Sequence, residues 1–364
     1  MPRLSVTRIA LIGACGRVGR QVSALIAAHG AGSGLRLVAV ANSRTSRVAP
    51  DGLDPATAAE RLETAVPVPD KALAAALAAL PRPLVVVDCT ASAQVAAQYP
   101  HWLGAGIDIV TPSKLASSGA RGLAAEIAAA SAKSGACLRD SAAVGAQLPL
   151  LATLRELRQA GDSIERFEAV LSGTLSFVLG RLELGEALSV AVRDAVTLGY
   201  AEPHPAADLS GEDAARKLVI LLRALGHDIE LADVETVPLV DGGHLAESDP
   251  RPLLARLGNL DELWRARVAV AQARRERWIY RASFDGSHAR VAPERVSADH
   301  ALAKLAPCEN ALILHSRYYR AAPLTIAGPG AGVELTAAAV FADLLDVARR
   351  NIAFPNAELP AVAA

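Results

Sequence analysis

A glycine-rich turn between a short apolar segment and an amphipathic helix limits the fold of this chain more than any other feature. The segment Arg8–Ile12 is almost entirely apolar, and Gly13, Gly16 and Gly19 follow it at three-residue spacing. One face of the next segment has helical periodicity and carries Val18, Val22, Leu25, Ile26 and His29. A strand, a turn that needs glycine dihedrals and a helix whose free N–H groups favour an anion together predict a dinucleotide-binding turn.

The candidate cofactor contacts in this turn are Gly13, Cys15, Gly16, Arg17, Val18 and Gly19. Their GxxGxxG spacing is one residue longer than the commonest fingerprint, so by itself it is only moderately specific. A glycine turn that serves packing alone is the alternative. Arg44 and Arg47 follow the next expected strand, where an NAD site usually has a carboxylate for the ribose 2′-hydroxyl. These arginines favour NADP, because they could bind a 2′-phosphate, over NAD; two solvated arginines on a surface loop are the alternative.

The first 140 residues alternate short β-rich segments with helical patterns, which is typical of βαβ units. Besides Arg8–Ile12, we expect strands at Leu35–Ala41, Leu84–Cys89 and Ile107–Thr111, all nearly continuous in apolar residues. The prediction is an α/β fold with a Rossmann-like parallel sheet and a second α+β domain for substrate binding and dimerisation. The first domain would comprise residues 1–147 plus about 318–364, and the second residues 148–317.

The pattern changes at about residue 148. We expect a helix to Gln159, a strand at Arg166–Ser172, helices ending near Leu198 and Leu225, strands at Trp278–Phe284, Ala311–Ser316 and Leu324–Ala327, and a last helix from about Thr336 to Arg349. The charges nearly cancel, with 37 Lys plus Arg against 38 Asp plus Glu, which favours small-molecule partners over nucleic acid or a membrane. Four scattered cysteines and no apolar run of about 18 residues predict a soluble, cytoplasmic protein without disulfides.

The segment from Gly199 to Lys217 is dense in acidic residues and ends in one of only five lysines. Asp213 and Lys217 are four residues apart, so on a helix they share one face, and Ser210 is a candidate N-cap. The residues after Lys217 are apolar on all sides, which predicts a buried helix. A lysine at the edge of such a helix, beside a carboxylate, is a candidate acid or base. An exposed ion pair of little energetic value is the alternative.

This segment resembles the signature of the homoserine dehydrogenases, and further blocks of the chain resemble that family in the same order. These blocks are Asp88-Cys89-Thr90-Ala91-Ser92, Val110-Thr111-Pro112-Ser113-Lys114, Leu171-Ser172-Gly173-Thr174-Leu175-Ser176-Phe177, Cys308-Glu309-Asn310-Ala311 and Gly328-Pro329-Gly330-Ala331-Gly332. The matches run from about residue 8 to 350. The family resemblance implies NADP-dependent or NAD-dependent hydride transfer between aspartate semialdehyde and homoserine, in a homodimer formed through the second domain's sheet.

The resemblance also implies a role for each matching residue. Lys217 would donate a proton to the aldehyde oxygen and Asp213 would orient it, while Lys114 would lie between cofactor and substrate. Substrate would be bound by Glu202, which would take its ammonium group, and by Asp208, Thr174 and Gly173. The cofactor would be lined by Thr90, Lys114, Gly199 and Gly332, in addition to the glycine turn and Arg44. The C-terminal helix would pack onto the first domain.

Several positions depart from the family pattern. His204 stands where the family has an aspartate, Ala207 replaces the first of two aspartates, and Ser113 replaces an asparagine. His204 is expected to be an exposed loop residue, with a proton-carrying role as the alternative. Family members hold a monovalent cation on carbonyls that correspond to Val144, Ala146 and Leu148. Gln147 and a displaced Asp140 change this loop and put the cation in doubt.

Two other functions remain open from the sequence. A different reductase of amino-acid metabolism, such as a dihydrodipicolinate reductase, has a similar glycine loop but does not need Asp213, Lys217 and the closing glycine block together. A catalytically weak NADP-binding paralogue that acts as a sensor would fit the altered acidic loop. The chain is expected to be a monofunctional enzyme, without a fused aspartokinase or a C-terminal regulatory domain of about 70–80 residues, and therefore without feedback control.

Overall fold

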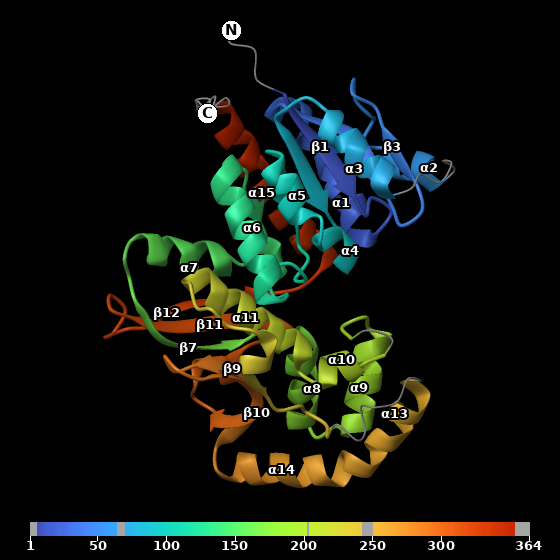
Figure 1. Ribbon diagram of the computed structural model, residues 1–364. Coiled ribbons are helices and arrows are strands. Elements are labelled where there is room, and N and C mark those ends of the chain that lie inside the picture. The colour runs from blue at the N-terminus through green and yellow to red at the C-terminus, as the bar shows by residue number, and fades with distance from the viewer. Residues whose placement is uncertain (1–5, 64–69, 202–203, 242–249, 354–364) are drawn as a thin grey trace. The chain divides into compact units, whose positions relative to one another are not determined.

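The protein is described by a computed structural model that covers residues 6–63, 70–201, 204–241 and 250–353. The chain divides into two compact units, Met1–Ala143 with Gly332–Ala364, and Val144–Ala331 (Figure 1). The sequence analysis places residues 144–147 and residues from about 318 in the first domain, whereas the structure places residues 144–147 and 318–331 in the second unit. The reason is that β12 (Leu324–Pro329) pairs with β11 (Glu309–Ser316). No helix within the described ranges is both long and apolar enough to cross a bilayer.

The first unit is built on a six-stranded sheet with the order β3-β2-β1-β4-β5-β6. Its strands are β1 (Thr7–Ile12), β2 (Leu35–Ala41), β3 (Ser46–Val48), β4 (Leu84–Asp88), β5 (Asp108–Val110) and β6 (Leu138–Arg139). All neighbours are parallel except β2 and β3, which are antiparallel. The Rossmann-like sheet and its four predicted strands are confirmed. The sequence does not predict β3 and β6, because segments of 3 and 2 residues carry no usable periodicity.

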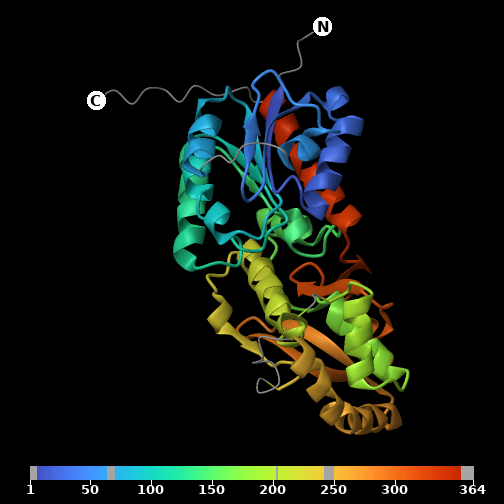
Figure 2. The same ribbon diagram turned by 90° about the vertical axis from the view of Figure 1, so that its right-hand side faces the viewer.

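Helices cover both faces of this sheet, as the apolar composition of its strands predicts. Ile9, Leu11 and Val87 face a core made with α1 (Arg17–His29), α2 (Ala58–Glu63) and α15 (Val333–Ala353). The opposite core joins Ala10 and Val86 to α3 (Asp70–Ala79), α4 (Ala93–Ala96), α5 (Tyr99–Gly104) and α6 (Arg121–Ser134). Figure 2 shows the sheet between these two layers. The prediction that the C-terminal helix packs onto the first domain is therefore confirmed.

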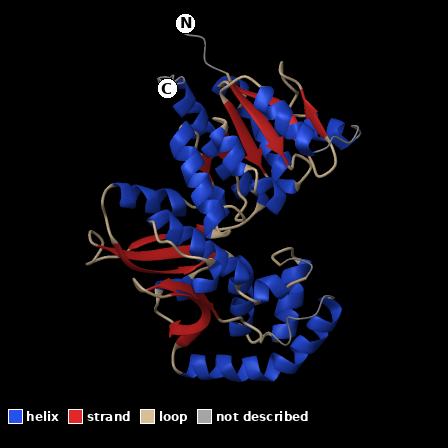
Figure 3. Cartoon of the chain, viewed as in Figure 1, coloured by secondary structure: helices blue, strands red, loops and turns tan. Residues whose placement is uncertain are grey.

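The second unit contains a six-stranded sheet with the order β12-β11-β7-β9-β10-β8 (Figure 3). The remaining strands are β7 (Ile164–Val170), β8 (Val234–Thr236), β9 (Glu276–Phe284) and β10 (Ala289–Ser297). All pairs are antiparallel except β10 with β8. One face carries Phe167, Ala169 and Ala282, which are buried, whereas Glu168 and Arg281 lie on the other face. The mixed sheet confirms the predicted α+β character of this unit.

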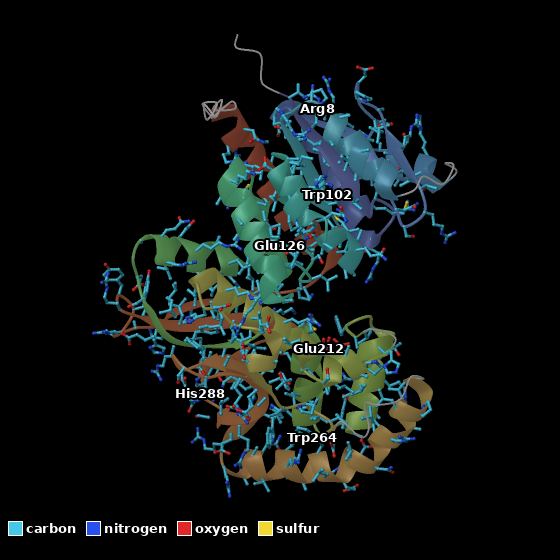
Figure 4. All side chains as sticks on the ribbon, viewed as in Figure 1. Arg8, Trp102, Glu126, Glu212, Trp264 and His288 are labelled. Carbon is cyan, nitrogen blue, oxygen red and sulfur yellow. The ribbon has the colours of Figure 1, made fainter. Side chains whose placement is uncertain are left out.

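In the described part of the second unit, the α-helices are α7 (Leu150–Gln159), α8 (Gly173–Glu183), α9 (Leu188–Thr197), α10 (Ala206–Leu209), α11 (Glu212–Leu225), α13 (Pro250–Leu257) and α14 (Asp261–Ala273). Where the sequence predicts one helix ending near Leu198, the structure has α8 and α9. Trp264 of α14, labelled in Figure 4, is fully buried and meets the Trp278 ring edge-on at 5.5 Å. This aromatic pair fixes α14 against β9.

Candidate active site

The glycine turn follows β1 directly, and its glycines stand where a side chain does not fit. Gly13 has φ +82°, and a Cβ there would lie 2.9 Å from the backbone C and O of Cys89. A Cβ on Gly19 would lie 2.1 Å from the carbonyl O of Gly13. Gly16 is the N-cap of α1 and offers no side-chain hydrogen bond to the first turn. Backbone N–H groups at a helix start, approached by a turn without Cβ atoms, fit the pyrophosphate of a dinucleotide.

The other candidate residues of this turn differ in exposure. Arg17 is exposed, whereas Cys15 and Val18 are half-buried. The Cys15 thiol lies 3.6 Å from the carbonyl O of Ala59, and its own carbonyl accepts a hydrogen bond from Arg20 Nε at 3.0 Å. Both the thiol and the carbonyl of Cys15 thus have hydrogen-bond partners, which hold the turn in place. The guanidinium of Arg17 in the same turn is exposed.

Thr90 lies in the loop after β4, and the buried carboxylate of Asp88 shapes that loop. Asp88 Oδ1 accepts a hydrogen bond from the Thr90 N–H at 2.8 Å, and the Tyr99 hydroxyl donates to Asp88 Oδ2 at 2.6 Å. Burial raises the pKa of Asp88, although these hydrogen bonds oppose the rise. A Cβ on Gly13 would lie 3.0 Å from Thr90 Cγ2, so the structure brings these two candidate residues together. The sequence analysis missed Tyr99, whose place beside Asp88 no local spacing indicates.

Arg44 lies in the turn between β2 and β3 and Arg47 lies in β3, and both side chains are exposed. Asn42 Oδ1 accepts hydrogen bonds from the N–H groups of Arg44 and Thr45, each at 2.8 Å. The Asn42 amide also lies 3.6 Å from Cys15 Sγ, which connects this turn to the glycine turn. Arg44 therefore lies at the tip of a turn that an asparagine side chain organises, while Arg47 belongs to the edge strand β3.

Lys114 and Gly332 are the remaining candidates in the first unit. Lys114 is half-buried in the loop after β5, and its carbonyl accepts hydrogen bonds from the N–H and hydroxyl of Ser118, both at 2.8 Å. Gly332 precedes α15 with φ +122°, and its carbonyl accepts the Thr336 N–H at 2.9 Å. The carboxyl ends of parallel strands, where Thr90 and Lys114 both lie, form the usual ligand edge of such sheets.

Asp213 and Lys217 lie on the first two turns of α11 and meet as their spacing predicts. Lys217 Nζ is 2.8 Å from Asp213 Oδ2 and donates a hydrogen bond to the carbonyl O of Leu171 at 2.7 Å. The Lys217 side chain is 14% exposed and that of Asp213 36%. Two N–H bonds of the ammonium thus have partners, while the residues that follow, Leu218 to Leu222, are buried. The alternative of a freely solvated ion pair does not describe a lysine with this exposure and a backbone partner.

The start of α11 differs from the sequence prediction. The N-cap is Gly211, in the left-handed conformation with φ +78°, and as a glycine it makes no side-chain capping hydrogen bond. Ser210, the predicted N-cap, lies one residue earlier, and its hydroxyl accepts the Glu212 N–H at 3.2 Å. A Cβ on Gly211 would lie 1.8 Å from the Tyr280 hydroxyl, so the close approach of β9 requires glycine here. Glu212, labelled in Figure 4, instead pairs with Arg216 on the exposed side.

Thr174 and Asp208, two predicted substrate contacts, lie together. The Thr174 hydroxyl is 2.5 Å from the carbonyl O of Tyr200 and 3.2 Å from Asp208 Oδ1, so one proton serves two acceptors. Thr174 is 8% exposed at the start of α8, next to Gly173. Gly199, exposed with φ +74°, ends the turn after α9 one residue before Tyr200. The segments 173–174, 199–200 and 208 therefore form one neighbourhood in the second unit.

The acidic loop itself is only partly described. Glu202, the predicted ligand of the substrate's ammonium group, lies outside the described residues. His204 is half-buried rather than exposed, and its Nδ1 lies 3.4 Å from the Ala206 N–H, so the expectation of an exposed loop histidine is wrong. Ala207 is exposed in α10, where the family has a carboxylate.

Val144, Ala146 and Leu148, the predicted cation ligands, lie in a tight turn of the second unit. Gly145 and Ala146 are both left-handed, with φ +78° and +49°, and the Leu148 N–H donates to the Gly145 carbonyl at 2.9 Å. The Leu148 carbonyl accepts the Leu150 N–H at 2.8 Å. Gln147 is exposed, and Asp140 accepts a hydrogen bond from the Ser117 hydroxyl at 2.5 Å in the first unit. A left-handed conformation is uncommon for a residue with a side chain, as Ala146 is here.

A dinucleotide-binding sheet, together with a second unit that holds a fixed lysine beside a carboxylate, defines the class of nicotinamide-dependent oxidoreductases. Residues 14–139 match the family model described as the NAD-binding domain of homoserine dehydrogenase. Residues 149–345 match the model for homoserine dehydrogenase itself. The chain belongs to the homoserine dehydrogenase family.

Individual relatives agree with this assignment. The chain is 38% identical over 266 residues to a bifunctional aspartokinase/homoserine dehydrogenase of Zea mays, a match that covers 72% of this chain and 29% of the relative. The corresponding protein of Haemophilus influenzae is 39% identical over 72% of this chain and 32% of its own length. The chain thus spans about a third of the length of the curated relatives it matches.

Solved structures share the whole fold. A Candida auris protein of unknown function superposes with a TM-score of 0.88 at 29% identity, over 95% of this chain and 99% of that one. An Archaeoglobus fulgidus protein described as a putative homoserine dehydrogenase superposes with a TM-score of 0.75 at 24% identity, over 94% and 99% of the two chains. At that identity, the second likeness establishes the fold alone.

Proposed function

We propose that this chain catalyses reversible NADP(H)-dependent hydride transfer between L-aspartate 4-semialdehyde and L-homoserine, a step in threonine and methionine biosynthesis. The observation that carries the proposal is the Lys217 ammonium, held at 2.8 Å by Asp213 and at 2.7 Å by the Leu171 carbonyl. A nearly buried amine fixed by two acceptors is preorganised to transfer its remaining proton to a ligand.

Reduction of an aldehyde needs a hydride at the carbonyl carbon and a proton at the carbonyl oxygen. The bound nicotinamide supplies the hydride. Lys217 donates the proton as negative charge develops on the oxygen, and in the reverse direction it accepts the proton of the homoserine hydroxyl. Asp213 keeps the ammonium in place and offsets its charge. Besides proton transfer, the protein must hold the substrate in the correct orientation.

We propose that the substrate is oriented by the neighbourhood around Thr174. Glu202 would bind the ammonium group common to both substrates. Asp208, whose Oδ1 is 3.2 Å from the Thr174 hydroxyl, would add negative charge on the same side, and Gly173 would leave room for the substrate backbone. Because Ala207 removes one acidic group of the family pattern, homoserine affinity is expected to be weaker than with two aspartates.

The cofactor would be bound mainly by the first unit. Gly13, Gly16 and Gly19 would hold the pyrophosphate, while Cys15, Arg17, Val18, Thr90, Lys114 and Gly332 would line the rest. Arg44 supports NADP over NAD, since a guanidinium at the tip of this turn can pair with a 2′-phosphate. A homoserine dehydrogenase of a hyperthermophilic archaeon has been solved with NADPH, and it shares 21% of its sequence with this chain.

A monovalent cation at the carbonyls of Val144, Ala146 and Leu148 is a further part of the proposal. The resemblance of this turn to the cation-binding loop of the family supports it. Activity would then rise with added sodium or potassium, whereas activity independent of both ions would remove the cation from the proposal.

We also propose a homodimer that packs through the face of the second unit's sheet that carries Glu168. Arg281 pairs with Glu168 at 3.1 Å on this face, and His300 Nε2 lies 3.2 Å from Glu168. Ile313, opposite Glu168 in the strand pairing, is buried in a cluster with Leu302, so the chain itself covers that part of the face. The internally paired charges beside this cluster suit a symmetric interface. Four free cysteines fit the reducing cytoplasm, which we propose as its location.

The decisive experiment is a steady-state assay of the purified chain with homoserine and NADP, and with aspartate semialdehyde and NADPH. Turnover in both directions supports the proposal. Cofactor binding without turnover would favour the sensor, and turnover on a cyclic imine would favour the dihydrodipicolinate reductase alternative.

A further inference from the structure

The start of β11 lies between two segments that the proposed mechanism uses only in part. Ala311 pairs with Val170, the last residue of β7, so Asn310 lies beside Leu171. On its other side, Asn310 pairs with Gly328 of β12. Asn310 is therefore flanked by the carbonyl that accepts a hydrogen bond from Lys217 and by the closing glycine block of the family resemblance.

The amide of Asn310 is buried in a way that packing alone does not explain. The residue is 1% exposed, and its Oδ1 has no hydrogen-bond partner in the described part of the chain. Its Nδ2 lies 3.5 Å from the Leu171 carbonyl O. An apolar side chain of similar size would avoid the cost of burying an unsatisfied amide oxygen, which indicates a polar role for this residue.

A glycine fixes the position of this amide. A Cβ on Gly330 would lie 2.2 Å from Asn310 Cγ and 2.4 Å from Nδ2. The backbone of Gly330 thus lies directly against the amide group, and any larger residue would displace it. Gly330 is therefore required for a steric reason that is independent of turn geometry.

We propose that Asn310 is a positioning residue for Lys217, acting through the Leu171 carbonyl. That oxygen is approached by the Lys217 ammonium at 2.7 Å and by the Asn310 amide at 3.5 Å. The amide N–H restrains the direction of the Leu171 carbonyl, and this carbonyl in turn restrains the Lys217 ammonium. The ammonium proton that is transferred to the substrate therefore points in the same direction in each turnover. This inference rests on the proposed role of Lys217.

The test is a double-mutant cycle on kcat, with Asn310→Ala measured in the wild-type and in the Lys217→Ala background. In the wild-type background, kcat is expected to fall about tenfold or more, while KM for NADP and homoserine stays within about twofold. In the Lys217→Ala background, Asn310→Ala is expected to change kcat less than about twofold, because the group it positions is gone. Gly330→Ala should reproduce the Asn310→Ala phenotype.

A control variant and a labelling experiment separate a positioning role of Asn310 from a general effect on β11. Ser316→Ala, which removes a buried hydroxyl at the other end of β11, is the matched control and should leave kcat unchanged. Because the chain has only five lysines, labelling with an amine-reactive reagent can be read residue by residue. Asn310→Ala should change the labelling rate of Lys217 relative to Lys133 and Lys304.

The outcomes are distinct. An equal loss of kcat in both backgrounds, or an unchanged labelling rate of Lys217, would overturn the positioning role. A wild-type protein that lacks turnover would instead remove the proposed function, and the labelling comparison would still decide whether Asn310 restrains Lys217.

Discussion

Asp213 and Lys217 lie one helical turn apart on α11, and their charged atoms are 2.8 Å apart where the buried half of the helix begins. If Asp213 orients the lysine, then Asp213→Asn keeps the shape but removes the charge that holds the ammonium. We expect kcat to fall about tenfold to a hundredfold. Glu212→Gln, which removes the preceding carboxylate on the exposed side, is the control in the same kinetic assay. An equal loss in both variants would indicate a general effect on the helix.

The arrangement of these two residues could be predicted from sequence, because a spacing of four residues on a helix is a local property. The Leu171 carbonyl, which also contacts Lys217, could not be predicted in this way. The Leu171 carbonyl is 46 residues away from Lys217, and Asn310 is 139 residues away from Leu171. Only the pairing of β7 with β11 brings them together, and no local pattern encodes which strands will be neighbours.

The strands show the same division between local and long-range information. β1, β2, β4 and β5 were predictable because burial on both faces makes each of them apolar at most positions. The sequence analysis did not predict β10, because this strand contains Pro293 and several charged residues. Its pairing with β8 covers only residues 289–291, so Pro293 has β9 as its strand partner and needs no N–H donor on the other side.

Gly19→Ala tests the cofactor turn. The new Cβ would lie 2.1 Å from the Gly13 carbonyl O, a backbone atom that cannot move aside as a flexible side chain could. We expect a loss of about 1–3 kcal/mol in the free energy of unfolding and a large increase in the Kd of NADPH, measured by denaturation and fluorescence titration. Gly122→Ala, in α6 of the same unit, has no atom within 4 Å of the new Cβ and should leave the Kd unchanged. NADPH binding that survives Gly19→Ala would place the cofactor elsewhere.

Arg44→Ala tests the choice of cofactor. A guanidinium bound to a 2′-phosphate contributes about 1.5–3 kcal/mol, so kcat/KM for NADPH is expected to fall about tenfold to a hundredfold. The value for NADH should change little, because NADH has no 2′-phosphate. Arg36→Ala, an exposed arginine on β2, is the control. Parallel losses with both cofactors would argue against contact with the 2′-phosphate.

Asp88→Asn predicts a pH dependence of stability. Burial raises the pKa of Asp88, so the folded state holds this proton more tightly than the unfolded chain does. The stabilisation is complete below the unfolded pKa of about 3.9 and is lost as pH rises through the folded pKa. Asparagine does not titrate, and therefore the Tm of Asp88→Asn minus that of the wild type should increase between about pH 4 and pH 7. A difference that is constant or decreases would contradict this assignment.

Lys217→Ala measured by steady-state kinetics tests the central claim most directly. Loss of the proton donor is expected to lower kcat about 10²-fold to 10⁴-fold in both directions, while the Kd of NADPH stays within about threefold. Arg216→Ala, which removes the neighbouring, half-buried cation that pairs with Glu212 on α11, should retain the wild-type kcat. A Lys217→Ala enzyme that turns over homoserine at the wild-type rate would contradict the account, because another group would then be moving the proton.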